Sequence, residues 1–440
     1  MHFKTIFIGR KFTMRTQVYC AVLAVLSLAV GCGGGGSGSS TQTPTTQTPT
    51  VASWTKVAST SVAYSGSVLS NNVIERSDGL MFVFGGPTPN DPMHTCATQS
   101  FKAVLAKADR TLTAVDNLLP VVNAVHAREM VVADFNGDAV PDVFSANHGC
   151  DGEPFPGERN TLLLSSGVQY VNANANLPNL SSFTHATDAA DLGRGKTDIV
   201  VLVTGTLGDA QVGSYILRGN GDGTFVRDTA ALPSKITERT MSAPAYTSVK
   251  LADVDRDGFV DLILGGMNFP NVVYLNDKAG SFNTSEIVLP AALYGANTST
   301  VDIQVLNDSG KQYLLLSQTP NYAGARVQVL ESHGDGTFSD VTSTMIPNQP
   351  QSQMWYQFLH VIDLNNDGCK DILIQTDRAD SNYVDDVRAF QNSCNGTFSV
   401  MDSSKVPDGS LIPGKLNGKD VLISTTRTSN QITVSLYAYQ

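Results

Sequence analysis

The sequence is short of charged residues, above all basic ones, and of long helical patterns. Asp, Glu, Lys and Arg make up only 16% of its 440 residues, and the net charge of −11 argues against a basic surface for nucleic acid. Six cysteines in so long a chain form neither a dense disulfide scaffold nor an obvious zinc cluster. A hydrophobic fraction of 41% still supports a folded core, and 38 Gly with 19 Pro predict many turns between strands.

The sequence also lacks the common catalytic motifs. It contains no Gly-x-Ser-x-Gly elbow, no His-Glu-x-x-His zinc pair and no phosphate-binding loop. Pairs of acidic residues are too common in an acidic chain to indicate a glycosidase. We therefore predict no catalytic residue.

The N-terminus has the pattern of an export signal. An apolar run over residues 17–30 follows Lys11 and Arg15 and is too short to span a membrane. Met1 and Met14 are both possible starts. The run ends in Ala29-Val30-Gly31-Cys32, which resembles a bacterial lipobox and implies that Cys32 becomes the lipidated N-terminus. Simple secretion with cleavage nearby is the alternative. Because no Asp follows Cys32, the resemblance favours the outer membrane or cell surface, on its periplasmic side or its exterior.

Three regions follow from this pattern. Residues 1–31 are the expected signal peptide, and residues 32–53 are the lipidated cysteine with a linker of Gly, Ser, Thr, Gln and Pro. The linker has too little apolar content to order itself. The folded part is expected over residues 54–440, as a monomer that meets the membrane only through its lipid.

An internal repeat predicts the fold. An apolar residue followed by Pro recurs with prolines at 120, 178, 233, 290, 347 and 407, which are 55 to 60 residues apart. Turns such as Gly221-Asp-Gly-Thr-Phe225 and Gly334-Asp-Gly-Thr-Phe338 precede these prolines, and runs such as Asp261-Leu-Ile-Leu264 have the composition of strands. Each unit therefore holds four strands, too few to bury both faces alone, and radial stacking supplies its neighbours.

The strand count predicts an all-β, seven-bladed β-propeller. Only three strands fit after Pro407, and the segment from Trp54 to Thr60 resembles an outermost strand of the other units. We expect this N-terminal strand to close the last blade.

Three Asp-rich loops precede second strands in this repeat. They read Asp134-Phe-Asn-Gly-Asp-Ala-Val-Pro-Asp142, Asp253-Val-Asp-Arg-Asp-Gly-Phe-Val-Asp261 and Asp363-Leu-Asn-Asn-Asp-Gly-Cys-Lys-Asp371. Oxygen side chains at positions 1, 3, 5 and 9, with a backbone carbonyl available at position 7, suit Ca²⁺ better than Mg²⁺. Asx turns without metal are the alternative.

Together with the Asn-x-Gly-Asp-Gly-Thr-Phe turn, these loops resemble the FG-GAP/VCBS repeats of integrin α-like calcium-loop propellers. The resemblance implies three structural Ca²⁺ sites away from the ligand-facing loops. The first loop departs from the pattern, with Gly137 early and Ala139 in place of Gly. The implied ligands are Asp134, Asn136, Asp138, Val140 and Asp142 in the first loop; Asp253, Asp255, Asp257, Phe259 and Asp261 in the second; and Asp363, Asn365, Asp367, Cys369 and Asp371 in the third.

Four cysteines remain for an oxidising compartment. Cys369 and Cys394 lie in two loops at the same end of one unit, and Cys96 and Cys150 lie in corresponding long loops of units 1 and 2. We expect a disulfide in each pair, with free buried thiols as the alternative for the second.

The opposite face carries loops of unequal length and four histidines, His94, His126, His148 and His185. These residues are either a pocket for a ligand such as a metal or a sugar, or buried polar contacts that fix the loops. We expect a surface-tethered, non-enzymatic binding or adhesion module for a glycan or protein. The alternative is a polysaccharide-acting hydrolase or lyase, which would need converging acid and base side chains in a deep pocket.

Overall fold

The computed structural model describes residues 52–87, 96–152, 156–204, 212–238, 244–376, 387–428 and 430–440. The predicted signal peptide, Cys32, nearly all of the linker and His94 lie outside these ranges. Among the described residues, no helix is long and apolar enough to cross a membrane.

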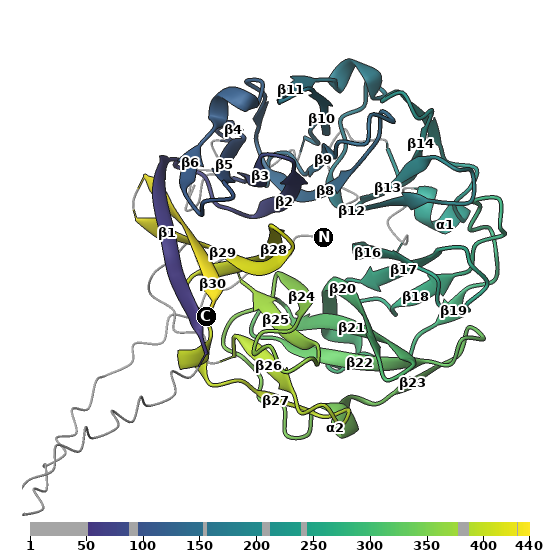
Figure 1. The fold of residues 1–440 in the computed structure, drawn as a ribbon. Helices are drawn as coiled ribbons and strands as arrows, with labels where there is room; N and C mark the ends of the chain where they lie inside the picture. Colours follow the sequence, from purple (N-terminus) through teal and green to yellow (C-terminus); the bar gives the residue numbers. More distant parts are fainter. Residues whose placement is uncertain are drawn as a thin grey trace, which may run out of the picture. The chain divides into compact units, whose positions relative to one another are not determined.

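Within these ranges the chain forms seven four-stranded antiparallel sheets, which follow one another around a central axis as the blades of a propeller (Figure 1). The seven-bladed, all-β prediction is therefore confirmed. The strands, from the innermost to the outermost of each blade, are: blade 1, β2 (Ser70–Arg76), β3 (Gly79–Gly85), β5 (Lys102–Ala106), β6 (Leu112–Ala114); blade 2, β8 (Ala127–Ala133), β9 (Asp142–Asn147), β10 (Thr161–Ser166), β11 (Gln169–Asn172); blade 3, β12 (Thr184–Asp191), β13 (Thr197–Val203), β14 (Tyr215–Gly219), β15 (Phe225–Asp228); blade 4, β16 (Tyr246–Ala252), β17 (Asp261–Gly266), β18 (Val272–Tyr274), β19 (Ile287–Val288); blade 5, β20 (Thr298–Asp308), β21 (Lys311–Pro320), β22 (Arg326–Ser332), β23 (Phe338–Asp340); blade 6, β24 (Phe358–Ile362), β25 (Asp371–Gln375), β26 (Ala389–Asn392), β27 (Phe398–Val400); blade 7, β28 (Ser410–Leu416), β29 (Lys419–Thr428), β30 (Gln431–Tyr439), β1 (Trp54–Ala63).

The remaining elements are short and lie between or beside the blades. They are the two-stranded pair β4 (Gln99–Ser100) and β7 (Asn123–Ala124), the helices α1 (Ser234–Thr237) and α2 (Thr342–Met345), and the 3-10 turns η1 (Asp116–Leu118), η2 (Asn174–Asn176), η3 (Gly295–Asn297) and η4 (Ser403–Lys405).

The N-terminal strand closes the ring, as the strand count predicts. β1 pairs antiparallel with β30, from Trp54 opposite Tyr439 to Ala63 opposite Gln431, so it runs three residues beyond the expected end at Thr60 (Figure 1). The Trp54 ring packs edge-on against Tyr439, with 5.5 Å between the ring centroids. The edge of β30 is thereby paired rather than open to other chains.

The hydrophobic core lies between neighbouring sheets. Alternate strand residues face the sheet on either side, so Leu202 and Ile216 of blade 3 pack with Leu262 and Leu264 of blade 4 in one buried cluster. Similar clusters join blades 7 and 1 and blades 5 and 6. Because each blade buries its faces against its neighbours, the contacts between neighbouring blades contribute much of the stability of each blade.

Candidate metal centres

The three Asp-rich loops occupy one structural position in blades 2, 4 and 6. Each joins the innermost strand to the second strand, and its ninth residue, Asp142, Asp261 or Asp371, begins the second strand. These three aspartates are almost completely buried. One carboxylate oxygen accepts the amide of position 2 and the other accepts an amide at the following hairpin. The amide donors are Phe135 and Ser165 (2.8 and 2.6 Å) for Asp142, Val254 and Asn276 (2.9 and 2.9 Å) for Asp261, and Leu364 and Asn392 (2.8 and 2.8 Å) for Asp371.

The first residue of each loop holds the turn from inside. In blade 4, Asp253 accepts the amides of Asp257 and Gly258 at 3.1 and 3.0 Å. In blade 6, Asp363 accepts those of Asp367 and Gly368 at 3.1 and 2.9 Å, and in blade 2, Asp134 accepts those of Gly137 and Ala139 at 2.7 and 2.8 Å. These bonds reach three to five residues ahead, so the first aspartate closes the whole loop, whereas the bond of an Asx turn reaches only two residues.

Positions 3, 5 and 7 are ordered by the same network. The side-chain oxygen of position 3 accepts the amide of position 5, and the carboxylate of position 5 accepts the amide of position 7. The amide of position 5 lies 3.0 Å from Asn136, 3.2 Å from Asp255 and 3.1 Å from Asn365 in the three loops. The amide of position 7 lies 2.8 Å from Asp138, 2.9 Å from Asp257 and 2.9 Å from Asp367, and it belongs to Val140, Phe259 and Cys369 in turn. All the predicted side chains are therefore gathered in each loop.

The carboxylates of the blade 4 loop also converge on one another. Oxygens of Asp253, Asp255 and Asp261 lie within 4.8 Å of one another. Burial, with the nearby charges of Asp255 and Asp253, raises the pKa of Asp261 to about 6. Burial, with Asp367 and Asp363, likewise raises the pKa of Asp371 to about 6. Such a set of hard oxygen ligands fits Ca²⁺ chemically, and a cation there would relieve the repulsion between the carboxylates.

The departure of the first loop from the pattern has a conformational explanation. Two positions of each loop are left-handed, namely position 4 (Gly137, Arg256, Asn366) and position 6 (Ala139, Gly258, Gly368). Glycine therefore relieves backbone strain at either position. The first loop places its glycine at position 4 rather than at position 6, and keeps the same turn.

Blade 3 shows how the site looks when arginine is present. Its loop is one residue shorter, yet Asp198 is fully buried at the start of the second strand and accepts the hairpin amide of Gly219 at 2.9 Å. The guanidinium of Arg194 forms a two-pronged ion pair with Asp198, and Arg218 approaches the same carboxylate at 3.1 Å. Here the protein itself supplies the cations.

The loops also join each blade to the next. The carbonyl oxygen of position 2 accepts a hydrogen bond from the following blade in all four cases. The donors are the Gly223 amide to Phe135 (2.9 Å), the Asn276 side chain to Leu192 (3.2 Å), the Ser332 hydroxyl to Val254 (2.7 Å) and the Trp54 indole to Leu364 (2.7 Å). Loop order and blade packing are therefore coupled, which supports a structural role for these loops.

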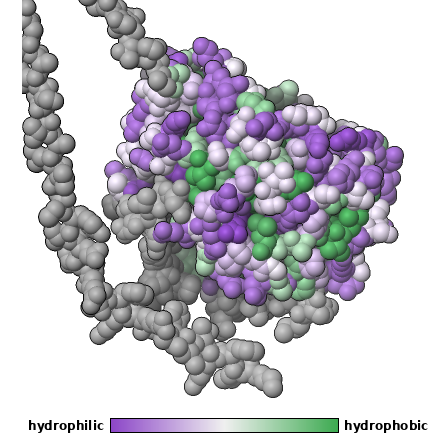
Figure 2. Space-filling view, turned by 90° about the horizontal axis from the view of Figure 1, so that it is seen from below, coloured by the Kyte–Doolittle hydropathy of each residue, from purple (hydrophilic) through white to green (hydrophobic). Residues whose placement is uncertain are grey.

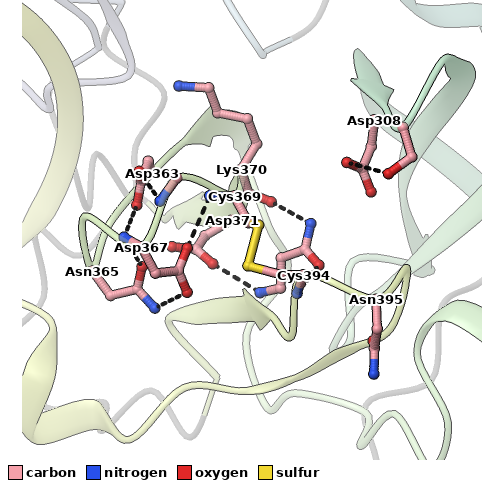
Figure 3. The surroundings of a disulfide bond; sticks show 12 residues. Asp308, Asp363, Asn365, Asp367, Cys369, Lys370, Asp371, Cys394 and Asn395 are labelled. Carbon is pink, nitrogen blue, oxygen red and sulfur yellow. Dashed lines mark hydrogen bonds between the residues drawn. A yellow bond between two sulfur atoms is a disulfide. The ribbon is translucent and has the colours of Figure 1, made fainter.

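Both predicted disulfides are present in the structure. Cys369–Cys394 ties the third loop to the hairpin turn of the same blade, with 5.5 Å between the Cα atoms (Figure 3). Cys96–Cys150 joins the long loops of blades 1 and 2, with a Cα separation of 5.2 Å. Disulfides fit an exported or extracellular protein.

The histidines lie at the other end of blades 2 and 3. His126 precedes β8 and His148 follows β9, but His185 is the second residue of strand β12, so its predicted place in a loop is wrong. The ring centroids are 4.8 Å apart for His126 and His148 and 5.6 Å apart for His148 and His185. Burial lowers the pKa of His126 to about 3 and lowers the pKa values of His148 and His185 well below the usual range. The sequence pattern thus grouped three residues that the fold brings together.

A central cavity of about 240 Å³ contains charged groups that the sequence pattern did not single out as a set. Glu129, Asp188, Lys250 and Asp302 line it, from the innermost strands of blades 2, 3, 4 and 5. Burial, followed by the charges of Asp302 and Asp188, raises the pKa of Glu129 to about 8. Lys250 approaches Asp188 at 3.2 Å. Because these residues are far apart along the chain, only knowledge of the ring geometry could have grouped them.

Comparison with known proteins agrees with the fold and the loops. A family model described as FG-GAP-like repeat matches residues 192–264 and 306–374, which include the Asp-rich loops of blades 4 and 6. The chain is therefore a seven-bladed β-propeller that contains FG-GAP-like repeats. No curated protein matches the sequence.

Two similar solved structures are distant in sequence. A chain from a crystal structure of BBS1N in complex with ARL6DN, soaked with lead, is 10% identical, with a TM-score of 0.43, and the match covers 88% of this chain and 97% of that chain. An ancestral GH74 enzyme is 12% identical, with a TM-score of 0.48, over 84% of this chain and 48% of that chain.

Proposed function

We propose that this chain is a calcium-stabilised β-propeller, exported and tethered through lipidated Cys32 to the outer membrane or cell surface, which binds a glycan or protein ligand without catalysing a reaction. The observation that carries the calcium part is the contrast between equivalent loops. In blade 3 two arginines neutralise the buried carboxylate. Among the described residues, no cationic side chain forms an ion pair with Asp253, Asp255 or Asp261 in blade 4. A bound Ca²⁺ would supply the missing positive charge.

The calcium part is tested by melting the full chain with and without the metal. A ligand that binds only the folded state adds about 2.7 kcal/mol at a hundredfold excess over its Kd. Chelation should therefore lower the melting temperature, and Ca²⁺ should restore it. Mg²⁺ should restore little, because it prefers to keep water ligands. An unchanged melt after verified metal removal would contradict the proposal.

The tether rests on the sequence around Cys32 and on the linker that follows. Cys32→Ser should release the protein from membranes, because one lipidated residue supplies the whole attachment. Its melting temperature should equal that of the native chain. Retention of the variant in the membrane fraction would mean that another anchor exists.

The polarity of the surface favours a polar ligand. Exposed large hydrophobic side chains among the described residues, such as Val121, Val226, Val288 and Val400, come from different parts of the ring. On the side drawn in Figure 2, hydrophilic residues dominate and hydrophobic residues form separate small groups. A glycan array probed with the calcium-loaded chain should therefore give specific binding, read alongside release of products from the same glycans.

The enzymatic alternative has one observation in its favour, the acidic groups of the central cavity. These groups also have a structural role. Glu129, Asp188 and Asp302 accept the amides of Thr187, Leu251 and Leu359 at 2.8, 2.9 and 2.6 Å, each from the innermost strand of the next blade. We therefore favour binding. Product release that disappears in Glu129→Gln, while binding to the array persists, would instead establish a hydrolase or lyase.

A further inference from the structure

Two histidines and an aspartate meet at the end of blade 2 that is remote from its Asp-rich loop. His126 and His148 flank the paired strands β8 and β9, and the His148 amide donates to the His126 carbonyl at 2.8 Å. The two imidazoles are thus neighbours across the strand pair. Asp134 lies at the other end of β8, seven residues beyond Ala127, which at about 3.3 Å per residue is on the order of 20 Å away.

The polar atoms of this cluster are close but do not form hydrogen bonds with one another. His126 Nδ1 lies 3.6 Å from one oxygen of Asp151, and His148 Nδ1 lies 3.6 Å from the other. Among the described residues, the buried atoms His126 Nε2 and His148 Nδ1 have no hydrogen-bond partner. The two histidines are only 7% and 5% exposed. Buried polar atoms without partners are rare in native proteins, and a bound ion would satisfy His148 Nδ1, the unpartnered atom that faces Asp151. In His126 the atom that faces Asp151 is Nδ1, and the unpartnered atom is Nε2.

The spacing suits ligands of one metal ion. Ligand atoms bound tetrahedrally to zinc at about 2.0–2.1 Å lie roughly 3.3–3.4 Å from one another. The observed separations of 3.6 Å exceed this by a few tenths of an ångström, and the nitrogen and oxygen ligand atoms of the three residues all lie within 4.8 Å. Imidazole with one carboxylate is a ligand set that favours zinc and other first-row transition metals over calcium.

The backbone around the cluster is held in place. The disulfide Cys96–Cys150 anchors the chain between His148 and Asp151. Glu158 accepts the amides of Val125 and His126 at 2.8 and 3.2 Å. The Asp151 side chain remains 54% exposed, so an ion has a path from solvent.

We propose that His126, His148 and Asp151 bind one divalent transition-metal ion, with zinc as the expected ion. Three protein ligands leave one tetrahedral position for water or for a group of a bound molecule. The site is separate from the Asp-rich loops in position and in ligand chemistry, and its existence does not depend on calcium binding there.

The test titrates the full, disulfide-bonded chain with Zn²⁺ in saturating Ca²⁺, and uses Co²⁺ as a spectroscopic substitute. We expect one Zn²⁺ per chain and visible Co²⁺ absorption that zinc abolishes. Asp151→Asn should weaken zinc binding by roughly tenfold or more, since even the mutation of a group that hydrogen-bonds to a metal ligand typically lowers metal affinity by about tenfold. His148→Gln should do the same. His333→Gln removes an exposed histidine of blade 5 and should leave binding unchanged.

Because the Asp151 side chain is about half exposed, we expect its substitution to affect metal binding without affecting folding. Asp151→Asn should melt like the native chain in the metal-free state, and it should lose only the rise in melting temperature that zinc causes. The proposal is overturned if zinc does not bind in saturating calcium, or if Asp151→Asn binds zinc as tightly as the native chain.

Discussion

Blades 3 and 4 each bury a carboxylate at the equivalent place of the loop, and different groups surround the two carboxylates. Asp198 and Asp261 both begin or nearly begin a second strand, both are almost fully buried, and both accept a hairpin amide at 2.9 Å. In blade 3 the charge is met by the guanidiniums of Arg194 and Arg218. In blade 4 the neighbouring side chains are themselves acidic, and Lys278 reaches only Asp257 at the exposed edge of the loop, at 3.2 Å.

The difference shows what the loop contributes to the ring. In both blades the carbonyl of position 2 receives a hydrogen bond from the next blade, so the loop is part of the joint between blades. In blade 3, Arg194 and Arg218 balance the charge of Asp198, so this contact between blades needs no bound cation. Under the proposed function, a loop of aspartates would instead make the contact depend on a bound cation, so the stability of the propeller would vary with calcium concentration.

The largest expected effect comes from removing the buried carboxylate of blade 3. Asp198→Asn removes the buried carboxylate that faces Arg194 and Arg218. Arg218 keeps its ion pair with Asp228 at 2.9 Å, so the expected cost is about 3 kcal/mol, the low end for a broken buried pair. Since no metal is involved, the loss of unfolding free energy should be the same with calcium and with chelator. Denaturant titrations in both conditions measure it.

Asp255→Ala is the matched variant in blade 4. Asp253 also accepts the Asp257 amide, at 3.1 Å, so the turn keeps its hydrogen bond when the Asp255 side chain is removed. The variant should lose stability in calcium, by up to the calcium contribution of that site, and little in chelator. Equal losses for Asp255→Ala in the two conditions would break the distinction between the blades.

A smaller effect should appear in the pH dependence. Burial and neighbouring carboxylates raise the pKa of Asp261 and Asp371 from the usual 3.8 to about 6 in the metal-free chain. The ionised groups therefore destabilise the fold above pH 6, and this cost disappears as the pH falls toward 4. Calcium needs the ionised forms.

The stabilisation by calcium should consequently shrink between pH 7 and pH 5, by something on the order of 1 kcal/mol for each site. Melting the chain at several pH values, with calcium and after dialysis against metal-free buffer, gives the difference directly. A calcium contribution that is equal at pH 5 and pH 7 would show that protons and calcium do not compete for these carboxylates.

Repetition explains how much of the fold the sequence predicts. The spacing of Pro120, Pro178 and their later counterparts repeats one unit, so the seven blades and the closing strand at Trp54 follow from counting. The loops and the Cys96–Cys150 disulfide are predicted for the same reason, because equivalent positions of a repeat lie at equivalent places in the ring. The Cys369–Cys394 disulfide is predicted because its two loops leave one unit at the same end.

What the sequence does not predict depends on side chains that the fold brings together. Arg218 lies 20 residues from Asp198 in the sequence, and nothing in the pattern indicates that the two form an ion pair. The central set of Glu129, Asp188 and Asp302 is likewise assembled from three blades. The sequence does not indicate that position 4 has a left-handed backbone conformation, because only blade 2 has glycine there. Blades 4 and 6 have Arg256 and Asn366 at this position.

The smallest expected effect concerns backbone strain at position 6 of the loops. Ala139 adopts φ of 64°, where glycine is favoured, so Ala139→Gly should stabilise the chain by roughly 0.5–1 kcal/mol. The reverse change, Gly258→Ala, should cost about 1 kcal/mol. A Cβ at Gly258 would meet no atom within 4 Å, so its cost is conformational and not steric. Both changes should be seen with and without calcium, since they act on the turn itself. A neutral Gly258→Ala in denaturant titrations would mean that the loops of blades 2 and 4 do not share one backbone conformation.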